Sequence, residues 1–125
     1  MNLLLDTHVL LWWLADDALL QPTARDAIRN QANVVFVSAA TAWEISIKKA
    51  LGKLDSPDDL ANTLELNNFH PLEITIAHAT MAGALPRHHD DPFDRMLIAQ
   101  AHVGQLTLVT HDGCFRAYEV AVIWT

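Results

Sequence analysis

The stretch Val34–Val37 (VVFV) is the clearest strand in the sequence, and it decides the class of fold. Its continuous apolar run is typical of a buried strand. Ser38 ends the run and is a favoured residue at the start of a helix, so we expect a helix from Ser38 to about Leu51, with Gly52 as its stop. A buried strand that leads directly into a helix is one unit of an α/β fold.

The same alternation extends along the chain in both directions. The apolar run Asn2–Leu5 predicts another buried strand. Further elements are expected as helices at about Val9–Ala15, Thr23–Gln31, Ser56–Asn67, Thr75–Leu85 and Pro92–Val103, the last ended by Gly104, and as strands at Pro71–Ile74, Leu106–Thr110 and Val120–Trp124. Strands that alternate with helices predict a parallel sheet covered on both faces, and a ligand site beyond the carboxyl ends of its strands.

Length and composition narrow the class of protein. A chain of 125 residues predicts a single domain over 1–125, and 51% hydrophobic against 18% charged residues excludes a disordered chain. The single cysteine, Cys114, excludes a disulfide framework and a cysteine-rich zinc module. The sequence shows neither a membrane-length apolar run nor a basic signal-peptide start. We therefore expect a cytoplasmic globular protein that does not bind membranes.

The charge balance raises a question about partners. Eight Lys and Arg residues face fifteen Asp and Glu residues, which gives a net charge of −7. Proteins that bind nucleic acid usually carry a basic surplus. Either this chain binds no nucleic acid, or some of its acids gather in one place to hold cations where a phosphate must approach.

Four acids stand where a site is expected. Asp6 directly follows the first strand, and Asp112 follows the Leu106–Thr110 strand after one residue, although each could be a simple loop acid or helix cap. Glu44 shares a helical face with apolar residues, but it also has the spacing of a capping box with Thr41 and of a surface pair with Lys48.

The fourth acid, Asp94, shares an apolar stripe with Leu97 and Ile98 and should therefore point inward. The alternative is that it only compensates the helix dipole as a first-turn acid. Clustered carboxylates repel one another, and a hard divalent cation such as Mg²⁺ or Mn²⁺ removes that conflict.

The whole chain resembles the PIN-domain ribonucleases, and specifically the VapC toxins of toxin–antitoxin pairs. The motifs that carry the resemblance are Leu3–His8 (LLLDTH), Ser38–Ile45 (SAATAWEI), Asp91–Ala101 (DPFDRMLIAQA) and Thr110–Asp112 (THD). The family's four acidic positions fall on Asp6, Glu44, Asp94 and Asp112.

The resemblance implies a three-layer α/β/α sandwich and Mg²⁺- or Mn²⁺-dependent endonucleolytic cleavage of RNA. Asp6, Asp94 and Asp112 would hold the metal ion, Glu44 would complete the site, and Thr7 and Thr110 would steady it. The resemblance further implies a VapB-like antitoxin as partner and a homodimer. The competing interpretations are a receiver-like signalling domain and a PIN-like scaffold that binds without cutting.

Other polar and aromatic groups are less suggestive. The run His88–Asp91 is interpreted as a solvated loop, and His102 and Cys114 as residues outside the chemistry. Lys48, Lys49 and Lys53 form the only lysine cluster, which could touch RNA or an acidic partner, although a solvated helix face is the commoner explanation. Trp12 and Trp13 are adjacent, so their side chains point about 100° apart on a helix. Core packing is the default for both, and the alternative is that one of them is exposed and anchors a partner.

Overall fold

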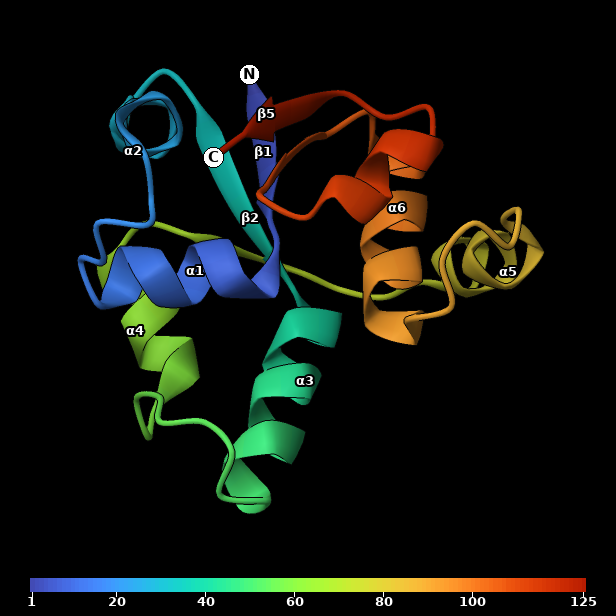
Figure 1. Ribbon diagram of the computed structural model, residues 1–125. Helices are drawn as coiled ribbons and strands as arrows, with labels where there is room; N and C mark the ends of the chain where they lie inside the picture. The colour runs from blue at the N-terminus through green and yellow to red at the C-terminus, as the bar shows by residue number, and fades with distance from the viewer.

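The computed structural model describes residues 1–125 and shows five parallel strands in one sheet (Figure 1). The sheet order is β3-β2-β1-β4-β5. The strands are β1 (Asn2–Leu5), β2 (Val34–Ser38), β3 (His70–Leu72), β4 (Thr107–Thr110) and β5 (Val122–Trp124). All four pairings are parallel. The predicted α/β class with a mainly parallel sheet is therefore confirmed.

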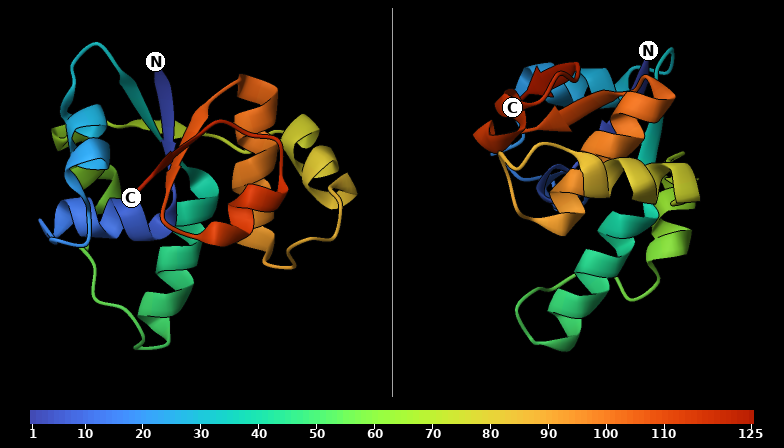
Figure 2. Two further views of the ribbon diagram at one scale, coloured as in Figure 1. Left: turned by 45° about the horizontal axis from the view of Figure 1, so that its top comes forward. Right: turned by 90° about the vertical axis from the view of Figure 1, so that its right-hand side faces the viewer.

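Helices cover both faces of this sheet (Figure 2). They are α1 (Thr7–Leu14), α2 (Pro22–Arg29), α3 (Ala39–Ala50), α4 (Leu60–Leu66), α5 (Ile76–Ala84) and α6 (Pro92–Gly104). Leu3 and Leu5 of β1 pack with α1, α2 and α4 in one core, whereas Leu4 packs with α6 in a second core. Successive side chains of a strand point to opposite faces, so the three leucines anchor both layers.

Several local predictions were wrong in their bounds. The helix expected at Ser56–Asn67 begins only at Leu60, because Asp59 accepts the hydrogen bond that caps it. Gly104 is the last residue of α6, and it is Gln105 that adopts the left-handed conformation, with φ of 53°. A short 3₁₀ helix, η1 (Gly113–Ala117), was not expected.

The order of the strands locates a possible binding edge. Starting from β1, the chain builds outward through β2 and β3 and then returns to the other side of β1 with β4. The strand order thus reverses between β1 and β4, the position where parallel α/β sheets bind ligands. Helix α3 starts at the same edge and extends away from the body of the protein (Figure 1). None of the helices is long and apolar enough to span a lipid bilayer.

Candidate active site

Asp6 lies at the carboxyl end of β1 and is almost completely buried, with 5% of its surface exposed. One carboxylate oxygen accepts a hydrogen bond from Val9 N at 2.8 Å and so caps α1. The other accepts a hydrogen bond from the hydroxyl of Thr110, at the end of the neighbouring β4. Burial nevertheless raises the pKa of Asp6 above its usual range, and the charge of Asp112 adds to this effect.

Asp112 lies two residues beyond β4 and also caps a helix. Its carboxylate accepts a hydrogen bond from Cys114 N at 2.9 Å, which lowers its pKa. Its own backbone N–H donates to Thr110 Oγ1 at 3.0 Å. The hydroxyl of Thr110 therefore joins Asp6 and Asp112 across the point where the strand order reverses.

Asp94 is the third member of the group and comes from the first turn of α6. Asp91 caps this helix by accepting from Phe93 N and Asp94 N at 2.8 and 3.1 Å, so Asp94 is not needed as the cap. Burial raises the pKa of Asp94 to about 6, and the charges of Asp91 and Asp112 act in the same direction. The predicted inward orientation is confirmed, because the side chain is only 22% exposed.

Glu44 joins the site through a threonine. Its Oε1 accepts a hydrogen bond from Thr7 Oγ1 at 2.6 Å, and Thr7 directly follows Asp6. Its Oε2 pairs with Lys48 at 3.0 Å, so the predicted surface pair exists although Glu44 itself is buried. The capping-box alternative is wrong, because Ser38 caps α3 through Ala40 N.

His89 is a residue of the site that the sequence interpretation missed. His88 and Asp90 are exposed, as expected of a solvated loop, but His89 is half-buried and its Nε2 lies 2.7 Å from Asp94 Oδ2. This contact raises the pKa of His89. A histidine five residues before Asp94 gives no helical or strand-like signal, because the intervening segment is a loop.

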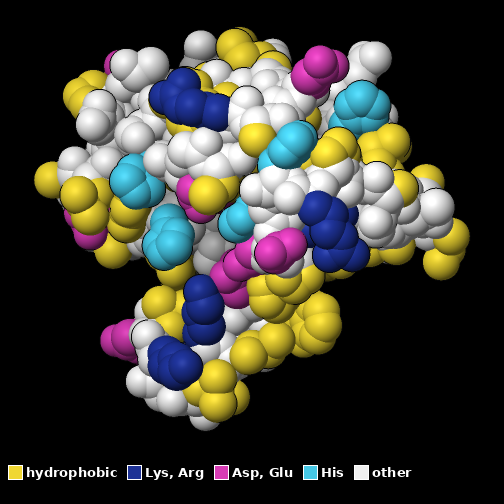
Figure 3. Space-filling view, turned by 45° about the vertical axis from the view of Figure 1, so that its right-hand side comes forward, with side chains coloured by type: hydrophobic (Ala, Val, Ile, Leu, Met, Phe, Trp, Pro, Cys, Tyr) yellow, Lys and Arg dark blue, Asp and Glu magenta, His cyan; other side chains and the backbone are white.

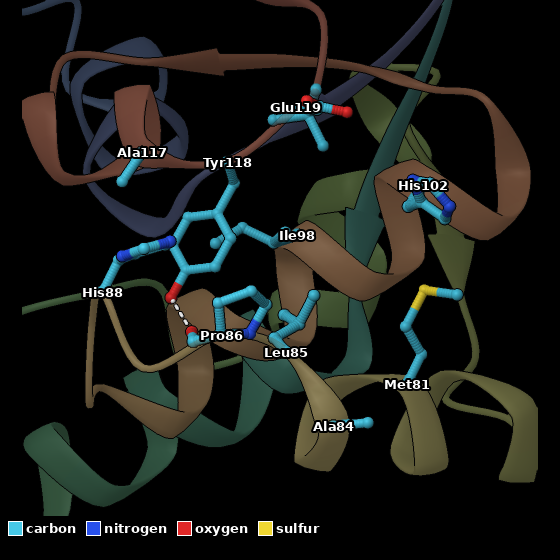
Figure 4. Close-up of a pocket in the computed structure, with 11 residues that line it drawn as sticks. Met81, Ala84, Leu85, Pro86, His88, Ile98, His102, Ala117, Tyr118 and Glu119 are labelled. Carbon is cyan, nitrogen blue, oxygen red and sulfur yellow. Dashed lines mark hydrogen bonds between the residues drawn. The ribbon is translucent and has the colours of Figure 1, made fainter.

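The loop that carries His89 is held by two side chains. The buried guanidinium of Arg95 donates to five backbone carbonyl oxygens, those of Ala82, Gly83, Leu85, Pro86 and His89. The hydroxyl of Tyr118 donates to Pro86 O at 2.7 Å (Figure 4). The same hydroxyl accepts from His89 N at 3.1 Å. Figure 4 also shows a mostly apolar hollow of about 380 Å³ beside Tyr118, bordered by His102 and lined by none of the four acids.

The two tryptophans of α1 pack against the core, which is the default expectation for them. Trp12 and Trp13 are both half-buried, and Trp13 Nε1 donates to Asn67 Oδ1 at 3.0 Å. The exposed tryptophan is Trp43 of α3, with 63% of its surface exposed and its ring against Phe93.

Figure 3 shows acidic side chains gathered on one face, with histidines nearby and Lys or Arg side chains beside and below them.

The lysine cluster is dispersed into different contacts. Lys48 pairs with Glu44, Lys49 pairs with Asp58 at 2.7 Å, and Lys53 is exposed.

Cys114 is exposed, and its hydrogen bond to Asp112 raises the pKa of the thiol. It therefore lacks the activation that a nucleophilic cysteine needs, as expected from the sequence.

The donor set fits a hard divalent cation. Asp6, Asp94 and Asp112 offer only carboxylate oxygens, which Mg²⁺ and Mn²⁺ prefer. Asp6 and Asp94 have raised pKa values, mainly because they are buried and partly because the charge of Asp112 is near.

We expect Asp94→Asn to stabilise the protein in the absence of metal ions. Because the pKa of Asp94 is raised to about 6, its protonated carboxyl group stabilises the folded protein. This contribution to the free energy of unfolding is complete below about pH 4 and is lost as the pH rises through 6. Asparagine stays neutral, so the free energy of unfolding should rise by about 1–2 kcal/mol above pH 7 and not below pH 4. Urea unfolding in EDTA across this range measures the effect. The exposed Asp90→Asn is the control, and a loss of stability at neutral pH would contradict the prediction.

Replacement of Arg95 by methionine tests how much the guanidinium hydrogen bonds stabilise the loop that carries His89. The substitution leaves several carbonyl oxygens without a donor, so we expect it to lower the free energy of unfolding by about 3 kcal/mol. Amide hydrogen exchange should also become faster at residues 85–91. Arg29→Met, on the exposed face of α2, is the matched control. A loss below about 1 kcal/mol would show that the guanidinium contacts contribute little.

Comparisons with known proteins agree with this geometry. The family model for the PIN domain matches residues 3–121. The ribonuclease VapC22 of Mycobacterium tuberculosis is 31% identical over 125 residues, covering 94% of this chain and 92% of that protein.

Solved structures show the same fold. A DNA-bound VapBC complex from Salmonella typhimurium matches with a TM-score of 0.72 at 17% identity, covering 98% of this chain and 97% of the other. VapBC-1 from Haemophilus influenzae matches with a TM-score of 0.68 at 17% identity, covering 99% and 98%. The family match rules out the receiver-like alternative. The chain belongs to the PIN-domain family and, within it, to the VapC-type ribonuclease toxins.

Proposed function

We propose that this chain cleaves RNA internally with Mg²⁺ or Mn²⁺ held by Asp6, Asp94 and Asp112, and that Glu44 completes the site. The observation that carries the proposal is the convergence of three carboxylates at the reversal of strand order. They follow β1, lie in the first turn of α6 and follow β4, and the charge of Asp112 raises the pKa of both Asp6 and Asp94. Such a group attracts a dication strongly.

The ion would supply Lewis-acid polarisation of the phosphate and activation of a water nucleophile. The protein's own contribution is to hold the ligands still. Thr110 steadies Asp6 and Asp112 together, and Thr7 orients Glu44. We assign Glu44 to orienting the attacking water, and we expect 5′-phosphate and 3′-hydroxyl products.

The acidic site needs help in receiving a polyanion. Lys48 lies beside Glu44 and its side chain is 43% exposed, so it is available to a phosphate of the RNA backbone. Trp43, one residue before Glu44, is exposed and offers a surface for base stacking. We propose that the RNA passes along this part of α3 with the scissile phosphate at the aspartates.

Asp6→Asn and Asp94→Asn should each reduce RNA cleavage by about 1,000-fold, or ~4 kcal/mol of transition-state stabilisation, because each removes a metal ligand. The assay follows cleavage of a labelled RNA and maps its 5′-phosphate ends. Asp90→Asn, an exposed acid of the neighbouring loop, should cut like the wild type.

Excess EDTA should abolish cleavage, and added Mg²⁺ or Mn²⁺ should restore it. Cleavage that persists in EDTA would contradict the metal mechanism. Absence of metal-dependent cleavage by the folded wild type would instead favour the scaffold that binds without cutting.

We further propose that the chain acts as one domain, forms a homodimer and is silenced by a VapB-like antitoxin. A solved structure with the same fold, from Klebsiella pneumoniae, is a toxin–antitoxin complex by name, and others are VapBC structures. On this chain Trp43, Ile47 and Leu51 form an exposed stripe at four-residue spacing along α3, which we call the α3 apolar stripe. Since it begins beside the acidic site, we expect an antitoxin segment that combines apolar side chains with a basic one.

Trp43→Ala should weaken binding of the antitoxin encoded next to this gene by about 30-fold, which corresponds to loss of an aromatic anchor worth about 2 kcal/mol. Isothermal titration with the purified antitoxin measures the change. Val103→Ala, an exposed apolar residue at the far end of α6, is the control. If Trp43→Ala instead lowers the molar mass of the free protein and leaves antitoxin affinity unchanged, the stripe belongs to the homodimer interface.

A further inference from the structure

A second set of metal-binding groups adjoins the aspartates. His89, Asp112 and Cys114 each bring one ligand atom to within 4.8 Å of the others. They come from the loop before α6, from the residue between β4 and η1 that caps η1, and from the first turn of η1. The set differs from the proposed catalytic one in chemistry, because it offers a nitrogen, an oxygen and a sulfur.

The ligand types select the metal. Imidazole and thiolate favour Zn²⁺ and similar borderline or soft ions, whereas Mg²⁺ and Mn²⁺ prefer oxygen. Three protein ligands with a fourth position open to water form a common zinc arrangement. The surrounding charge also favours a dication, because Asp94 Oδ2 lies 2.7 Å from His89 Nε2.

The segments that carry the three groups are held by hydrogen bonds before any ion binds. Hydrogen bonds to Tyr118 and Arg95 hold the backbone of His89 at its N–H and its carbonyl oxygen. Asp112 is fixed by Cys114 N and Thr110 Oγ1. The Cys114 side chain is exposed, so an ion can enter without opening the fold. Such preorganisation reduces the cost of assembling the ligands.

We propose that His89, Asp112 and Cys114 form a binding site for Zn²⁺ or a related transition-metal ion next to the catalytic aspartates. Binding releases the thiol proton to solvent, the sulfur donates an electron pair to the ion, and the ion keeps its oxidation state. Because Asp112 belongs to both sets, zinc bound here removes a ligand from the Mg²⁺ or Mn²⁺ site and inhibits cleavage. The inhibition rests on the proposed function, whereas the binding does not.

Cobalt(II) provides the direct test of binding. Titration of the reduced, Mg²⁺-free protein with Co²⁺ should produce a near-ultraviolet thiolate-to-cobalt charge-transfer band that saturates at about one ion per chain and is reversed by Zn²⁺. Cys114 is the only cysteine, so the band can only come from it. Cys114→Ser should abolish the band, and His89→Gln and Asp112→Asn should each weaken binding at least about ten-fold.

His88→Gln is the matched control, because His88 is the exposed neighbour of His89 and belongs to neither set. Circular dichroism and thermal melting check that each variant is folded. Absence of the band in the wild type would overturn the proposal. A band of unchanged affinity in folded His89→Gln and Asp112→Asn would overturn it too, because the thiol would then bind the ion alone.

A second experiment addresses inhibition. With Mg²⁺ present, Zn²⁺ should inhibit RNA cleavage by the wild type, and Cys114→Ser should require at least about ten-fold more Zn²⁺ for half-inhibition, each protein being normalised to its own zinc-free rate. Equal sensitivity of the two proteins would overturn the inhibitory role. A protein that cuts no RNA under any condition would contradict the proposed function, and the cobalt titration would still decide the metal site.

Discussion

The pairing of β1 with β4 is the contact on which the rest of the site depends. Leu5 is in register with Val109, so Asp6 and Thr110 emerge side by side at the carboxyl end of the sheet. The Thr110 hydroxyl then joins Asp6 to the backbone of Asp112. Because the strand order reverses at this pair, the connections leave in opposite directions and leave space above the two strand ends. A shift of β4 by one residue would turn Thr110 to the other face of the sheet.

Helix α6 also constrains the position of the site, and three residues at its start have different roles. Asp91 caps the helix, Asp94 points toward the aspartates, and Arg95 turns the other way to bind the loop that follows α5. Side chains of consecutive residues in a helix point about 100° apart, so adjacent residues contact different neighbours. Leu97 and Ile98 then bury the helix against the sheet, which fixes the height of Asp94 above the strand ends.

The electrostatics explain how an acidic chain can act on RNA. The net charge is −7, but the acidic side chains of the site are concentrated at the strand ends. Two cationic or basic side chains, His89 and Lys48, lie beside them. A bound dication would cancel much of this local charge where a phosphate must approach. Burial of the ionised Asp94, together with a smaller effect of the neighbouring carboxylates, destabilises the ion-free protein at neutral pH, so the requirements of the site oppose the stability of the fold there.

Much of the fold was predictable, because its signals are local. The apolar runs at Asn2–Leu5 and Val34–Val37, the cap at Ser38 and the helical stripe of Asp94 depend on residues close in the chain. The positions of Asp6 and Asp112 after strands were also readable from the sequence. Local bounds failed where a competing cap existed, as at Asp59, or where a glycine stood one residue before the left-handed position, as at Gly104.

The sequence by itself thus determined the alternation of strands and helices and the set of acids at their ends. Only the tertiary structure decided the strand order, the approach of His89 to Asp94, the exposure of Trp43 and the grouping of His89 with Asp112 and Cys114. These contacts join segments whose separation in the chain is bridged by packing and by the hydrogen bonds of Arg95 and Tyr118. Hydrophobic periodicity reports which face of an element is buried, but it carries no information on which other element covers that face.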